Sequence, residues 1–131
     1  MPDPMKQSEL ERAFETRWRQ LHPELPMPVQ QYRGIPGRKF RFDMCWRGPM
    51  VVVELQGGTW SRGRHTRGQG YENDCEKLNL AQMHGWMVFY LTTTMLKNDP
   101  KRWLDFIADA IQDRTCQRVV QKQGLDCKGG K

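Results

Sequence analysis

Hydrophobic residues recur at helical spacing in three parts of the chain, and this pattern predicts three helices. The first is expected at residues 8–21, the second at 71–84, and the third from the Asn-Asp-Pro sequence at 98–100 to about 121. The side chains expected on the buried faces of these helices are Leu10, Phe14, Trp18, Leu21, Leu78, Ala81, Trp103, Phe106, Ile107, Ala110 and Ile111, with Tyr71 and Cys75 as further candidates in the second helix.

Strand patterns occupy much of the remaining sequence. In residues 40–46 large apolar side chains alternate with polar or small ones, so Asp43 should point away from the aromatic face. The β-branched run at 50–56 is typical of a central strand covered on both faces, and 86–91 predicts another buried strand. Residues 22–38 carry four prolines, which predicts an extended connection that does not pack.

The order of elements is helix, strand, strand, long glycine-rich loop, helix, strand, helix, which predicts an α/β fold. A chain of 131 residues suits a single domain, here with a central, mainly mixed sheet flanked by helices. Residues 1–7 and 122–131 are expected to be loose tails. The chain has neither a long apolar run nor a secretory signal, so we expect a cytoplasmic protein without membrane contact.

Charge and cysteine usage narrow the class of partner. Lys and Arg outnumber Asp and Glu by 21 to 15, giving a net charge of +6, and many arginines lie at 33–47 and 62–67. This balance favours a polyanionic partner, although a solvated basic surface without nucleic acid remains an alternative. The four cysteines are scattered and match no zinc spacing, so we expect reduced thiols and no zinc.

Two acidic residues interrupt the strand patterns. Asp43 and Glu54 lie on strands joined by a short turn, and in a hairpin their carboxylates can converge on one edge of the sheet. Two nearby carboxylates repel each other unless a divalent cation binds between them, and Mg²⁺ prefers such oxygen ligands. Alternatively, each acid ends its strand facing water or pairs with Arg41 or Arg47.

A family resemblance rests on these residues. Asp43 in "RFD" and Glu54 with Gln56 in "VVVELQGG" resemble the core of the PD-(D/E)XK nuclease superfamily. Over about residues 8–96 the order of acidic strand, basic glycine-rich loop, D-x-x-K helix and Gly-Trp before a strand is similar to small phage and bacterial members related to Holliday-junction resolvases and very-short-patch repair endonucleases. The resemblance implies a restriction-endonuclease-like core of αβββαβ type and a Mg²⁺-dependent DNA endonuclease, with Mn²⁺ as a substitute.

The resemblance also suggests roles for individual residues. Asp43 and Glu54 would hold the metal ion, with Gln56 as a third ligand. Gln56 stands where the superfamily usually has a catalytic lysine, and Lys77 in "DCEKLN" could replace that charge, unless it is an exposed helix residue paired with Asp74. Relatives often supply an acid from the first helix. Glu11 could do so here, with Glu15 as its alternative, or it could close a capping box with Ser8.

Basic and aromatic residues form the expected nucleic-acid surface. His65 could in addition donate a proton to the leaving oxygen, although a loop histidine can equally be solvated or contact phosphate. Trp60 is the tryptophan expected to touch substrate. The full set is Arg38, Lys39, Arg41, Trp60, Arg62, Arg64, His65 and Arg67.

Three functions remain open at this point. Structure-selective cutting of branched DNA would require a homodimer with one site for each of two strands. Nicking at a mismatch or a specific sequence could be done by a monomer. The third is a non-catalytic nucleic-acid-binding module on the nuclease fold, favoured by Gln56 in place of lysine.

Overall fold

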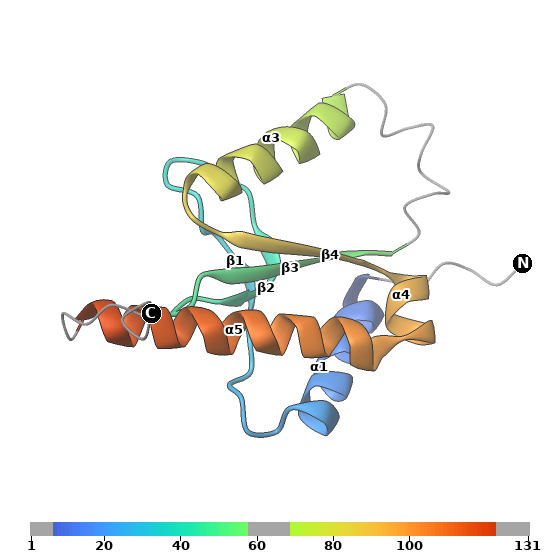
Figure 1. Ribbon diagram of the computed structural model, residues 1–131. Helices are drawn as coiled ribbons and strands as arrows, with labels where there is room; N and C mark the ends of the chain where they lie inside the picture. Colours follow the sequence, from blue (N-terminus) through green and yellow to red (C-terminus); the bar gives the residue numbers. More distant parts are fainter. Residues whose placement is uncertain (1–6, 58–68, 123–131) are drawn as a thin grey trace, which may run out of the picture.

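The structure, a computed structural model, describes residues 7–57 and 69–122 (Figure 1). Within these ranges the protein is a single-domain α/β fold with a four-stranded mixed sheet flanked by helices. The elements in chain order are α1 (Gln7–Leu21), β1 (Val29–Tyr32), β2 (Phe42–Trp46), β3 (Val51–Gln56), α3 (Gln69–Met83), β4 (Met87–Thr92), α4 (Thr93–Asn98) and α5 (Pro100–Lys122).

The strands lie in the order β1-β2-β3-β4. The first three are antiparallel neighbours, and β4 runs parallel to β3 because α3 carries the chain back across the sheet. The turn at Arg47–Met50 joins β2 to β3, which confirms the expected hairpin. Residues Val51 to Leu55 of β3 are buried, as expected for a central strand.

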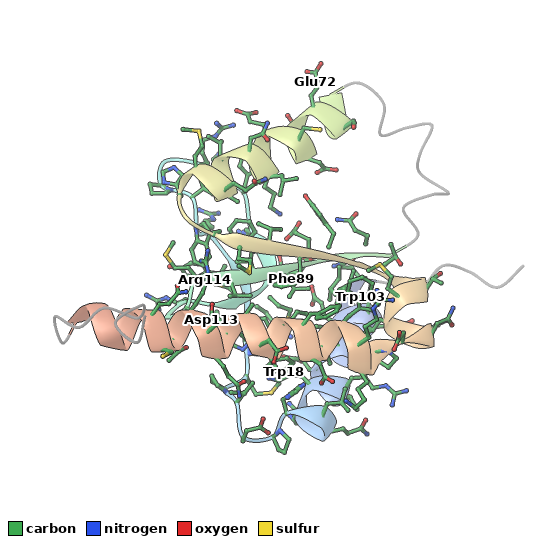
Figure 2. The ribbon with its side chains drawn as sticks, viewed as in Figure 1. Trp18, Glu72, Phe89, Trp103, Asp113 and Arg114 are labelled. Atoms are coloured by element: carbon green, nitrogen blue, oxygen red, sulfur yellow. The ribbon has the colours of Figure 1, made fainter. Side chains whose placement is uncertain are left out.

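Helices cover both faces of the sheet, as Figure 1 shows, with α3 on one side and α1 and α5 on the other. The larger core cluster lies on the α1 and α5 side, and Phe89 of β4 packs against it there (Figure 2). A smaller cluster lies under α3 and includes Phe42, Cys45, Val52 and Trp86. The central sheet therefore has an apolar core on each face.

The Pro-rich segment after α1 differs from the prediction, because it packs. It contains β1, and Ile35 is buried in the smaller cluster. The indole N–H groups of Trp18 and Trp46 both donate to the carbonyl oxygen of Pro26, at 3.1 and 2.8 Å. The prolines at 26, 28 and 36 lie outside β1, so each of its four residues has a backbone N–H group. A short edge strand can therefore form between Pro28 and Pro36.

The strand faces also differ in two places. Met44 and Trp46 belong to the larger cluster, whereas Phe42 belongs to the smaller one, so the predicted alternation of aromatic positions breaks at Asp43. In the described sheet β4 is an edge strand rather than a fully buried one, with Met87 and Tyr90 each 37% exposed.

The helical boundaries and faces need smaller corrections. In α5 the buried residues include Leu104 and Ala108, whereas Phe106 is exposed and Trp103 is half-buried. The predicted tails 1–7 and 122–131 each overlap a helix by one residue, and their other residues lie outside the described part of the chain.

Within residues 7–57 and 69–122, none of the helices combines the length and hydrophobicity that crossing a membrane requires.

Candidate acidic site at the sheet edge

A row of polar residues crosses the sheet near one end of its strands. Gln31 of β1 lies opposite Asp43 of β2, because the residues on either side of them are paired. Continuation of the β2–β3 register by one residue places Asp43 opposite Glu54, and Glu54 is paired with Tyr90 of β4. The two predicted acids are therefore neighbours on adjacent strands.

Hydrogen bonds fix both carboxylates against the backbone. The Asp43 amide N–H donates to Glu54 Oε1 at 3.0 Å, and the Leu55 amide N–H donates to Asp43 Oδ2 at 2.7 Å. Each side chain thus accepts from the backbone of the neighbouring strand at the point where the β2–β3 ladder ends. Backbone N–H donors thus help to hold both carboxyl groups in defined orientations.

Lys77 extends from α3 to the same point. Its Nζ lies 2.7 Å from Glu54 Oε2 and also donates to the carbonyl oxygen of Arg41. The Lys77 and Glu54 side chains are only 13% and 11% exposed. Lys77 is therefore not an exposed helix residue paired with Asp74, and its ammonium group stands beside the Glu54 carboxylate.

Glu11 of α1 reaches the row through Gln31. The Gln31 side-chain amide nitrogen donates to Glu11 Oε1 at 2.8 Å and to Asp43 Oδ1 at 3.3 Å. Ser8 lies inside α1, so the capping-box account of Glu11 is wrong, and Glu11 instead joins the acidic site. Three elements, α1, β2 and β3, each contribute one carboxylate.

The acids influence one another electrostatically. Burial raises the pKa of Glu54 and the nearby Asp43 carboxylate raises it further, whereas Lys77 and the Asp43 N–H lower it. Burial is also the main cause of the raised pKa of Glu11, to which Asp43 and Glu15 add, while the hydrogen bond from Gln31 opposes the rise. Added positive charge at this site would stabilise the ionised acids.

The donor set suits a hard divalent cation in its chemistry, since Glu11, Asp43 and Glu54 contribute carboxylate oxygens along one connected set of hydrogen bonds. In the residues that the structure describes, however, no three Asp, Glu, His or Cys side chains are already grouped as a cation site. The N–H donors of Gln31 and Lys77 occupy oxygen positions that a cation would share. The residues fit Mg²⁺ if these donors shift.

Tyr90, which no sequence pattern singled out, completes the row on the β4 side. Burial, followed by the negative charge of Glu54, raises the pKa of Tyr90 to about 12. The phenol consequently keeps its proton at neutral pH and can donate a hydrogen bond near Glu54.

Gln56 lies two residues beyond Glu54, half-buried at the end of β3 and paired in register with Thr92. Strand alternation places it on the same face as Glu54. Gln56 thus lies two residues along β3 from Glu54, whereas hydrogen bonds connect Glu54 with Asp43 and Lys77, and connect Asp43 with Glu11 through Gln31.

The basic residues before β2 lie close to α3. Arg38 pairs with Glu76 at 2.7 Å and stacks over the Phe40 ring, whereas Lys39 and Arg41 are exposed. Arg38 and Lys39, together with neighbouring residues, line an open pocket of about 420 Å³. The lining residues are Gly37, Arg38, Lys39, Phe40 and Asn73. This surface adjoins the acidic site, because the Arg41 carbonyl accepts from Lys77.

The other predicted contacts fall in the glycine-rich segment. Trp60, Arg62, Arg64, His65 and Arg67 lie outside the described residues, so their predicted roles stay predictions.

Comparison of the chain with models of protein families, with curated proteins and with solved structures finds no match in any of the three.

Proposed function

We propose that the protein is a Mg²⁺-dependent DNA endonuclease with a restriction-endonuclease-like core, acting in the cytoplasm on branched DNA. The observation that carries the proposal is the set of contacts around Glu54 at one end of the sheet, where its carboxylate accepts from the Asp43 N–H and pairs with Lys77. Two carboxylates on neighbouring strands and a lysine beside them are the groups that the superfamily pattern requires, and here the lysine comes from α3 rather than from position 56.

Each residue has a defined task in this proposal. Asp43 and Glu54 would hold the cation, with Glu11 and Gln56 completing its protein ligands. When bound, Mg²⁺ supplies Lewis acidity that activates water and offsets charge on the phosphate. Lys77, held beside Glu54, would donate to a phosphate oxygen as negative charge develops there.

The net charge of +6 and the exposed basic residues next to the site support a DNA partner. Arg38, Lys39 and Arg41 would contact the phosphate backbone, which favours binding regardless of sequence. Arg62, Arg64, Arg67, His65 and Trp60 would extend this surface. Cutting two strands of a junction would bring two copies together as a homodimer, whereas mismatch-specific or site-specific nicking would need one copy.

A non-catalytic DNA-binding module is the second candidate, and one observation favours it. The Glu54 carboxylate already accepts from Lys77 and from the Asp43 N–H, so the acids are stabilised without a cation. In that case the site would be structural and the basic surface alone would bind DNA.

Cleavage of labelled four-way junction, flap, mismatch and plain duplex DNA with Mg²⁺ or Mn²⁺ tests the proposal. Glu54→Gln removes the charge but keeps the side-chain shape, and Asp109→Asn, an exposed acid on α5, is the matched control. We expect cutting by the wild type and the control, and its loss in Glu54→Gln. Binding without cutting by all three proteins would favour the non-catalytic module.

Thermal melting gives a second test that needs no DNA. A cation bound at the site should raise the melting temperature of the wild type, because ligand binding to the folded state stabilises it. Asp43→Asn should lose this response. An equal Mg²⁺ response in both proteins would place the cation elsewhere.

A further inference from the structure

Gln31 occupies an unusual position in β1. Its φ of 53° lies in the left-handed region, which residues other than glycine rarely adopt in a strand. The paired residues on either side of it keep one register with β2, while Gln31 itself is absent from the ladder of partners. The backbone therefore departs from strand geometry at this residue alone, and its surroundings must hold it there.

In this backbone conformation the side chain of Gln31 contacts two acids of the site. Its amide nitrogen reaches Glu11 of α1 at 2.8 Å and Asp43 of β2 at 3.3 Å. A primary amide nitrogen carries two hydrogens, so one group can donate to both carboxylates. Gln31 is thus the connection between the helix acid and the strand acids of the site.

Glutamine suits this place better than other residues of similar size. Leucine could not donate to either acid, and asparagine would be one methylene shorter. A glutamate would add a third negative charge next to Glu11 and Asp43. A bound cation could compensate this charge, but without the cation the three carboxylates would repel one another. Moreover, an amide has an oxygen as well as a nitrogen, so rotation about its last bond replaces a donor with a neutral ligand oxygen.

We propose that Gln31 is a positioning residue of the site, which aims Glu11 at Asp43 and turns its amide oxygen toward a cation that binds between them. This inference rests on the proposed function in its choice of cation, and it adds Gln31 to the residues that determine cation affinity. Residues that orient metal ligands typically change metal affinity by about 10- to 100-fold when they are replaced.

Binding of Mn²⁺ and Mg²⁺ to the protein alone, measured by calorimetry, tests the role without requiring catalysis. Gln31→Leu should weaken cation binding by roughly 10-fold or more. Gln30→Leu, one residue earlier on the same strand, is the control and should bind as the wild type does. Gln31→Glu, which returns an oxygen ligand at the same backbone conformation, should restore affinity to the wild-type level or above.

These variants separate positioning from a general disturbance of β1. A merely structural defect would weaken binding in Gln31→Leu and would not be rescued by glutamate. Equal affinity in wild type, Gln31→Leu and Gln30→Leu would overturn the inference, as would the absence of cation binding by the wild type.

Cation binding and DNA cleavage can fail independently, so the role of Gln31 and the proposed endonuclease activity are tested separately. Cation binding that depends on Gln31, in a protein that cuts none of the DNA substrates, would sustain the role of Gln31 and refute the endonuclease. Cleavage with Gln31→Leu as active and as cation-responsive as the wild type would sustain the endonuclease and refute the role.

Discussion

Replacing Lys77 by methionine removes the positive charge beside Glu54 while keeping an unbranched side chain of similar length over the Phe42 ring. Loss of one partner from a fully buried ion pair costs about 3–5 kcal/mol. The Lys77 and Glu54 side chains retain 13% and 11% exposure, and Glu54 keeps its bond from the Asp43 N–H. We therefore expect the free energy of unfolding to fall by about 2–3 kcal/mol at pH 7.

Proton uptake limits this loss and makes it depend on pH. Protonating a carboxyl group of ordinary pKa 4.5 costs about 3.4 kcal/mol at pH 7, from about 2.5 pH units at about 1.36 kcal/mol each. At pH 5 the same step costs about 0.7 kcal/mol. Without Lys77 the pKa of Glu54 rises further, so the folded state of the variant holds a proton that the unfolded state releases as pH rises above 4.5. The deficit should shrink from about 2–3 kcal/mol at pH 7 to about 1 kcal/mol at pH 5.

Urea unfolding of wild type and Lys77→Met at both pH values measures these changes. At this chain length the pH 7 loss corresponds to a fall in melting temperature of about 10 °C. The double variant Lys77→Met/Glu54→Gln should recover most of the stability, because no buried charge remains. Lys101→Met, from an exposed pair with Asp105, is the control and should change little. A Lys77→Met protein as stable as wild type at pH 7, or with the same deficit at pH 5, would refute the ion pair as a structural contact.

Three further results follow from the packing. Gly34→Ala should lower the unfolding free energy by about 1–3 kcal/mol in urea, since an added Cβ would lie 2.8 Å from the Trp86 ring; unchanged stability would show that the ring can move. Burial raises the pKa of the Cys45 thiol to about 12, so at pH 8 iodoacetamide should modify exposed Cys75 first, as mass spectrometry would show; equal labelling would contradict this burial. Because the Tyr90 phenol has a pKa of about 12 in the fold and an ordinary value of 10.0, stability should decline between pH 10 and 12, and Tyr90→Phe should lessen that decline.

Much of the site follows from local pattern. A hairpin with a short turn forces its two strands into antiparallel register, so Asp43 and Glu54 could be predicted as neighbours from their distances to the turn. Helical spacing in α1 predicted Leu10, Phe14 and Trp18 as core residues, and all three are buried.

Other parts depend on contacts that local pattern does not encode. β1 was missed because the prolines around it suggest a connection, and its pairing with β2 decides otherwise. Gln31 was missed with it, since a positive φ at glutamine has no sequence signal. Phe106 was placed on the buried face of α5 because helical spacing gives a period, whereas the side that faces the sheet is set by Leu104 and Ala108.

The two faces of the sheet are unequally secured, and this has a consequence for motion. Four of the described α5 side chains of residues 100–117 are buried, among them Leu104 and Ile107, whereas Ala81 alone is buried among the described α3 side chains of residues 70–83. Segments with few buried contacts open locally at lower free energy than the rest of a fold. Amide hydrogen exchange should therefore be faster in α3 than in α5. Each such opening would carry Lys77 away from Glu54, so the helix that opens more readily than α5 is also the one that controls how long that carboxylate stays neutralised.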